Sequence, residues 1–186
     1  MKALIIVDMQ EDFISGALGT PEAQAIVPNV VDRLKFHENT DTIILFTKDT
    51  HYDDTYAGSM EGTKLPVSHC MINTPGWSIV RPIHDEFKHG NYATVSTESV
   101  INGRVIKSTF GSWDLIDVLA NYDLDEIELC GVCTDICVVS NALMLKAAFP
   151  ETPIIVNASC CAGVTPEKHA AALEVMKSCQ IDVIGE

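Results

Sequence analysis

The chain has 186 residues, of which 47% are hydrophobic and 20% are charged, and its 26 acidic residues outnumber its 12 Lys and Arg residues. The formal charge of −14 disfavours binding to nucleic acids and anionic membranes, because both interactions depend on clustered Lys and Arg. The hydrophobic fraction is too high for a disordered chain, and the length fits a single domain over residues 1–186. A small molecule or another protein is therefore the expected partner.

The chain contains seven cysteines, an odd number that cannot pair completely within one chain. A strand-like segment begins at residue 3, which leaves no room for a signal peptide, and no apolar run approaches the roughly 18 residues of a membrane span. We therefore expect a cytoplasmic protein whose cysteines are free thiols.

Short apolar segments rich in β-branched residues alternate with longer segments of helical periodicity. The expected strands are Ala3–Val7, Thr42–Thr47, Arg104–Lys107, Ile127–Val132, Pro153–Asn157 and Asp182–Ile184. The expected helices are Ile26–His37, Ser112–Asn121, Cys137–Ala148 and Pro166–Cys179. Several strands are continuously hydrophobic, as is typical of parallel strands covered on both faces, so the order predicts an α/β domain with a mainly parallel sheet. Residues 51–99 show no strong period and are expected to form a long, ordered, functional loop.

Reactive side chains follow four of the expected strands. Asp8 follows the first strand, Asp49 and His51 follow the second, Lys107 ends the third, and Cys137 lies shortly after the fourth. Because ligands bind beyond the carboxyl ends of strands in open parallel sheets, these groups are expected to share one site.

Cys137 is a candidate nucleophile. It stands at the start of the expected helix Cys137–Ala148, which Thr134 or Asp135 can cap with a side-chain oxygen. The helix dipole and a nearby Lys107 ammonium would both favour the thiolate, and first-turn amides could hold an oxyanion. A buried structural cysteine is the alternative, and position alone does not decide between the two.

Asp8 is the candidate proton carrier, because a carboxylate at a buried strand end is costly unless it is paired or functional. It could take the proton of the Cys137 thiol and deliver it to a leaving amine. The alternatives are that Asp8 only forms an Asx-type turn and that Lys107 is an ordinary surface lysine.

Asp49 and His51 stand two residues apart, so in an extended segment their side chains point to the same side. Glu61 and His69 are the nearest further metal ligands in the sequence, with Asp53, Asp54, His84 and His89 as rivals. Two carboxylates and two imidazoles would suit zinc, iron or manganese. From spacing alone, a solvated acidic loop is the more common outcome for such a segment.

Cysteines 130, 133 and 137 have a spacing that also allows a redox dithiol or part of a metal site. The strand-like run around Cys130 would hold it away from Cys137, and the adjacent Cys160 and Cys161 chelate poorly. We expect Cys130, Cys160, Cys161 and Cys179 to fill small spaces in the core.

Five stretches occur in an order that resembles a known family. They are ALIIVDMQEDF, FTKDTH, EGTKLPVSHC with NTPGW, IKSTFGSW and LCGVCTDICVVSNA. Together they are similar to the isochorismatase-like cysteine hydrolases, in the nicotinamidase/pyrazinamidase branch. The resemblance implies a three-layer αβα fold with a six-stranded parallel sheet.

The resemblance also assigns a catalytic triad. The aspartate corresponds to Asp8, the lysine to Lys107 and the nucleophile to Cys137. Members of the family have a cis peptide at the position of the Val132–Cys133 bond, which aims the amides of Cys133 and Cys137 at the oxyanion. Cys133 departs from the family, where apolar residues are more usual, and could form a disulfide with Cys137 on oxidation.

In the nicotinamidase branch a divalent metal binds beside the triad and holds the ring nitrogen. Asp49, His51 and His69 match its ligands, and Glu61 matches an acid that some members use. Zinc is the expected metal, with iron or manganese as alternatives. Phe13 and Phe110 match aromatic residues that flank the substrate ring, and members often form homo-oligomers.

The expected activity is therefore hydrolysis of a small-molecule amide, with nicotinamide as the favoured substrate and a place in NAD salvage. Isochorismate or a carbamoyl or ureido amide is the alternative substrate. Because isochorismatases cleave a vinyl ether without a thiol nucleophile, Cys137 favours C–N cleavage. A non-catalytic metal-binding or thiol-redox module is the alternative of another class.

Overall fold

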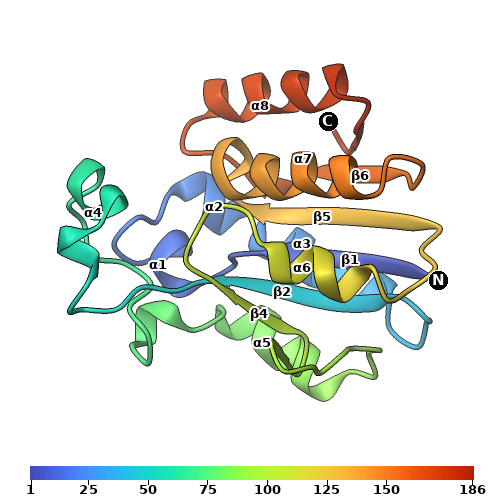
Figure 1. Ribbon diagram of the computed structural model, residues 1–186, viewed down its shortest axis with the longest axis horizontal. Coiled ribbons are helices and arrows are strands. Elements are labelled where there is room, and N and C mark those ends of the chain that lie inside the picture. Colours follow the sequence, from blue (N-terminus) through green and yellow to red (C-terminus); the bar gives the residue numbers. More distant parts are fainter.

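A single seven-stranded sheet forms the centre of the computed structural model, which describes residues 1–186 (Figure 1). Its strand order is β3-β4-β2-β1-β5-β6-β7. The strands are β1 (Lys2–Val7), β2 (Ile43–Asp49), β3 (Val100–Ile101), β4 (Arg104–Lys107), β5 (Glu126–Val132), β6 (Ile154–Ala162) and β7 (Asp182–Ile184). Six of them are parallel, as predicted. The seventh, β3, is antiparallel to β4 at the edge of the sheet and was missed, because two residues carry no readable alternation.

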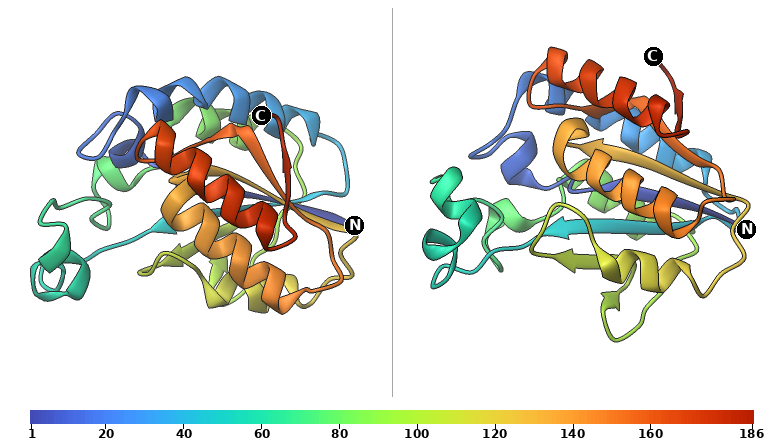
Figure 2. Two further views of the ribbon diagram at one scale, coloured as in Figure 1. Left: turned by 90° about the horizontal axis from the view of Figure 1, so that it is seen from above. Right: turned by 45° about the horizontal axis from the view of Figure 1, so that its top comes forward.

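Helices cover both faces of the sheet, so the predicted three-layer arrangement is confirmed. They are α1 (Glu11–Ile14), α2 (Pro21–Ala25), α3 (Val27–Phe36), α4 (Met60–Lys64), α5 (Arg81–His89), α6 (Trp113–Leu119), α7 (Val139–Ala148) and α8 (Pro166–Ser178). Figure 2 shows α3 and α5 on one face of the sheet and α6, α7 and α8 on the other. No helix is both long enough and apolar enough to cross a membrane.

Burial on both faces explains why β1 and β2 are almost continuously apolar. Every residue of β1 from Ala3 to Val7 and every residue of β2 is buried. Both strands lie in the middle of the sheet, where side chains of either direction meet a helical layer. The polar residues at the end of β2 are therefore held inside the protein, which requires partners for each of them.

The chain reverses its direction of travel across the sheet at β1. From β1 it proceeds through β2 to β4 on one side, then returns to β5 on the other side of β1. Such a reversal opens a crevice beyond the carboxyl ends of the two strands, where ligands bind in α/β sheets. Asp8 follows β1 and Cys137 follows β5, so both lie at this crevice.

The segment 51–99 contains more regular structure than its sequence suggested. Besides α4 and α5 it has two short 3₁₀ turns, η1 (Tyr56–Gly58) and η2 (Pro75–Trp77). Helix α5 begins with a proline in its first turn and buries Ile83 fully while Phe87 packs on the core. These two apolar positions lie four residues apart among seven polar or proline residues, so the sequence pattern does not predict a helix here.

Gly131 brings β1 and β5 together directly behind the site. It pairs with Val7, has φ of +119°, and a Cβ atom built on it would lie 2.1 Å from the carbonyl oxygen of Val7. No L-side chain fits there without moving the strand that carries Asp8.

We therefore predict that Gly131→Ala lowers the free energy of unfolding by about 3 kcal/mol or more, measured by urea denaturation. Gly58→Ala is the matched control, because a Cβ at Gly58 meets no atom within 4 Å. Its effect should stay within about 1 kcal/mol, and equal effects of the two substitutions would contradict this account of the strand contact.

Candidate active site

Asp8, Lys107 and Cys137 come from three different strand ends and meet in the interior. The Lys107 Nζ lies 2.7 Å from Asp8 Oδ2 and 3.6 Å from Cys137 Sγ. All three residues are buried, with Asp8 fully inaccessible. The structure thus brings together the acid, the amine and the thiol that the sequence singled out.

Thr47 and Lys107 hold the Asp8 carboxyl group. The Thr47 hydroxyl donates to Asp8 Oδ1 at 2.6 Å, while the Lys107 ammonium faces Oδ2. Burial raises the pKa of Asp8, and the Lys107 charge opposes this shift. Burial acts to lower the pKa of Lys107, but the charges of Asp8, Cys137 and Asp49 outweigh it and the pKa is raised. Lys107 is therefore a permanent cation at this site.

Two effects of opposite sign act on the Cys137 thiol. Burial, followed by the Asp8 carboxylate, raises the pKa of Cys137, and the opposing Lys107 charge is the smaller effect. The expected capping of the helix by Thr134 or Asp135 is not found. Thr134 bonds His169 and Asp135 accepts from the backbone of Val164, so neither caps the helix.

A π-helical turn, η3 (Thr134–Val138), places Cys137 between β5 and α7. The Val132–Cys133 peptide is cis, as the family resemblance implied. The Cys133 carbonyl accepts from the amides of Ile136 and Val138, whereas the Cys133 N–H donates to no acceptor in the protein. That N–H is thus available to an oxyanion beside Cys137.

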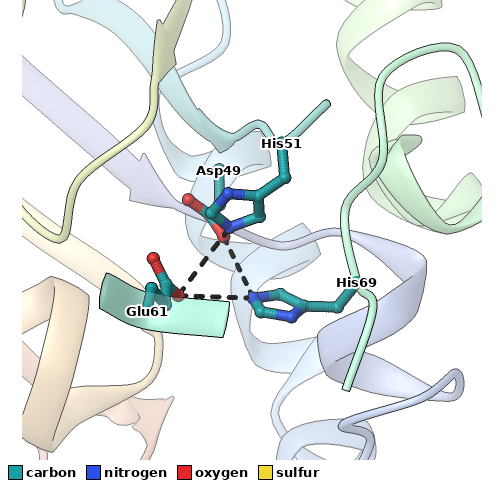
Figure 3. A group of neighbouring side chains, drawn as sticks. All are labelled: Asp49, His51, Glu61 and His69. Carbon is teal, nitrogen blue, oxygen red and sulfur yellow. Dashed lines mark hydrogen bonds and ion pairs between the residues drawn. The ribbon is translucent and has the colours of Figure 1, made fainter. Parts of the chain in front are cut away.

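Asp49, His51, Glu61 and His69 form a compact cluster next to the triad (Figure 3). Asp49 ends β2, His51 follows it, Glu61 comes from α4 and His69 from the loop beyond. Asp49 Oδ2 lies 2.9 Å from His51 Nε2 and 3.4 Å from His69 Nε2. Glu61 Oε1 lies 3.7 Å and 3.6 Å from the same two nitrogens.

These distances fit a divalent metal ion. Donors about 2.1 Å from a tetrahedral zinc are roughly 3.4 Å apart, close to the separations within the cluster. His69 Nδ1 lies 2.8 Å from the Val67 carbonyl oxygen, which turns Nε2 toward the other donors. Although burial lowers it, contacts with Asp49 and Glu61 raise the pKa of His69 to about 10, which shows how strongly the two carboxylates favour a cation there.

Gln10 positions the cluster and was not singled out in the sequence. Its side-chain amide accepts from the Asp49 N–H at 2.7 Å and donates to the Asp49 carbonyl at 2.9 Å. Gln10 is fully buried, so this pair fixes the backbone from which Asp49 reaches the histidines. The only feature of the sequence that indicates a role for Gln10 at the site is its position two residues after Asp8.

Asn141 is a second residue that the sequence did not reveal. Its side-chain amide donates to the carbonyls of Phe110 and Cys137 and accepts from the Ser112 N–H. It thereby ties α7 to the loop after β4. Such a bond joins segments about 30 residues apart, which no local pattern indicates.

A cavity of about 360 Å³ connects Cys137 of the triad with the metal cluster. Its lining residues include Cys133 and Cys137 on one side and Asp49, Glu61 and His69 on another. Phe13 and Phe110 also line it, as expected of residues that flank a ring. The remaining wall is largely apolar, with Leu18, Leu65, Ile136 and Val164.

The rival residues lie elsewhere. Asp53, Asp54, His84 and His89 are not part of the metal cluster. Cys130, Cys160 and Cys161 are buried thiols, as predicted, whereas Cys179 is exposed, so its assignment to the core was wrong. It follows α8 directly, where helical periodicity no longer predicts burial.

Comparison with known proteins identifies the family. The model of the isochorismatase domain matches residues 2–185. The chain belongs to the isochorismatase domain family. It is 26% identical to a nicotinamidase/pyrazinamidase of Mycobacterium tuberculosis over 99% of this chain and 98% of that protein.

Solved structures give the same result. A Bacillus subtilis nicotinamidase/pyrazinamidase matches with a TM-score of 0.80 and 27% identity, over 98% of each chain. A Pyrococcus horikoshii pyrazinamidase in complex with zinc matches with a TM-score of 0.76 and 27% identity, over 100% of this chain and 99% of that one.

Zinc binding should depend on the histidines of the cluster and not on those outside it. We predict that His69→Ala weakens the affinity for Zn²⁺ more than about 100-fold, because a donor atom is lost from a buried site. Affinity is measured by competition with a chromophoric chelator. His84→Ala, a histidine outside the cluster, is the control and should bind zinc like the unmodified protein; similar losses in both variants would contradict the assignment.

Proposed function

We propose that this protein is a nicotinamidase, an amidohydrolase that converts nicotinamide and water to nicotinate and ammonia. The observation that carries the proposal is the shared cavity, which is lined by the nucleophile Cys137 and by three members of the metal cluster, with the Asp8–Lys107 pair directly beside Cys137. The nicotinamidases among its relatives support the choice of substrate. Residues 1–186 would act as one catalytic domain.

In the first step the Cys137 Sγ attacks the carboxamide carbon and its proton passes to Asp8. The carbonyl π electrons move to oxygen, and the resulting oxyanion accepts hydrogen bonds from the amides of Cys133 and Cys137. Loss of one such donor typically costs about 10²–10³ in rate.

In the second step Asp8 gives its proton to the nitrogen, the C–N bond breaks, and ammonia leaves behind a thioester on Cys137. Asp8 then removes a proton from water as the water oxygen attacks the thioester carbon. The C–S bond breaks, the proton returns to sulfur, and nicotinate is released. Throughout, Lys107 stabilises the negative charge that alternates between Asp8 and Cys137.

Asp49, His51, Glu61 and His69 would hold a divalent metal, which we propose is zinc. A bound metal supplies a Lewis acid that can hold the pyridine nitrogen of the substrate. Phe13 and Phe110 would stack against or flank the ring, so that the carboxamide points toward Cys137. We expect a small-molecule amide as the ligand, and neither a nucleic acid nor a membrane as a partner.

Other amides are the alternative substrates within the family, and the metal cluster argues against them because it offers a partner to a ring nitrogen. A non-catalytic metal-binding or thiol-redox module would not need a buried amine beside both the acid and the thiol. A cytoplasmic location, a homo-oligomeric state and a role in NAD salvage stay predictions.

We predict that Cys137→Ala abolishes ammonia release from nicotinamide, with a loss of at least about 10⁴-fold in kcat, because no thioester can form. Ammonia is measured with a coupled enzymatic assay. Cys179→Ala, at the exposed cysteine, is the matched control and should retain full activity.

Two outcomes would contradict the proposal. Substantial activity in Cys137→Ala would exclude the covalent step. Ammonia release from carbamoyl or ureido amides but not from nicotinamide, in the zinc-loaded protein, would reassign the substrate while leaving the amidohydrolase chemistry in place.

A further inference from the structure

Two lysines that take no part in the proposed mechanism face the reaction cavity. Lys64 ends α4 and Lys168 lies in the first turn of α8, and both line the 360 Å³ cavity. Outside the metal cluster they are its only charged lining residues. In a chain with 26 acidic and 12 basic residues, a cavity whose free charges are both positive is unexpected.

Neither lysine is engaged by the protein. Both are exposed, and no carboxylate lies within 4 Å of either Nζ although acids are abundant in the chain. Lys168 lies near the oxyanion side of the cavity, since its charge acts to lower the pKa of the Cys133 thiol. Lys64 stands three residues after Glu61 on α4, beside the metal cluster.

The two lysines belong to α4 and to the start of α8, two segments that lie beyond the carboxyl ends of the strands (Figure 1). The cavity wall is otherwise mainly apolar, with Phe13, Leu65 and Ile136 among its residues. Low-dielectric walls strengthen the field of charges at the opening of a cleft. A carboxylate in the cavity would therefore be attracted by both lysines.

We propose that Lys64 and Lys168 form an anion-binding subsite at the cavity opening that recognises aromatic carboxylates, first of all the acid product of the reaction. The inference rests on the proposed function for the identity of the product. Amide and acid have nearly the same size and shape and differ by one negative charge near neutral pH. The subsite therefore favours the acid over the amide and controls product retention.

Calorimetry on the zinc-loaded Cys137→Ala protein tests the subsite without turnover. The dissociation constants of nicotinate and nicotinamide, and of benzoate and benzamide, are measured at low salt in this background and with Lys64→Met and Lys168→Met added. The ratio of the acid's to the amide's dissociation constant should rise about fivefold or more in the double lysine variant. Raising the salt concentration should produce a similar change in the parent background.

Lys88→Met is the matched control, because Lys88 is exposed on α5, has no ion pair and does not line the cavity. Its ratio should equal that of the parent. Ratios that are unchanged in the double lysine variant, equal changes for acid and amide, or failure of both carboxylates to bind would overturn the proposal. Failure of the proposed function is recognised separately, by the absence of ammonia release from nicotinamide in the unmodified protein.

Discussion

The ion pair between Asp8 and Lys107 is the interaction on which the site depends. Both side chains are almost completely inaccessible, and their charged atoms are 2.7 Å apart. Removing two charges from water is costly, and the attraction between them offsets that cost only when the geometry is good. Loss of either partner would leave the other as an unpaired buried charge next to Cys137, so acid, amine and thiol act as a unit.

The sheet supplies this geometry through strand order. Lys107 ends β4, Asp49 ends β2, Asp8 follows β1, and Cys137 follows β5, and these four strands are consecutive neighbours. Parallel alignment places their carboxyl ends on one edge of the sheet, so residues far apart in sequence meet without long connections. The reversal at β1 opens the crevice into which the thiol and the carboxylate project.

Much of this arrangement follows from the sequence because strand ends are marked by clear changes from apolar to polar residues. The positions of Asp8, Lys107 and Cys137 at those ends, and the pair formed by Asp49 and His51, could be predicted on that basis. The participation of Glu61 and His69 in the cluster required the family resemblance, since the same segment contains rival acids and histidines. The catalytic roles of Asp8, Lys107 and Cys137 and the metal-binding roles of the cluster stay predictions.

Other features depend on contacts that no local pattern reveals. The apolar stripe of helix α5 is too narrow to predict the helix from the sequence. Strand β6 extends beyond its predicted end to Ala162, because its second half still pairs with β5 after a register shift. The side chains of Thr134 and Asp135 look like helix caps but bond α8 and the loop before it. Burial raises the pKa of Cys137, and the motif alone does not reveal this effect.

The central claim is that Asp8, paired with Lys107, enables Cys137 to form a bond to the carboxamide carbon. Mass spectrometry of acid-quenched protein during turnover of nicotinamide tests it most directly, with Asp8→Asn compared against the unmodified chain. The account predicts an acyl adduct on the peptide that contains Cys137 in the unmodified protein and none in the Asp8→Asn variant. Adduct formation at an equal rate in both, or ammonia release without any trapped adduct, would contradict it.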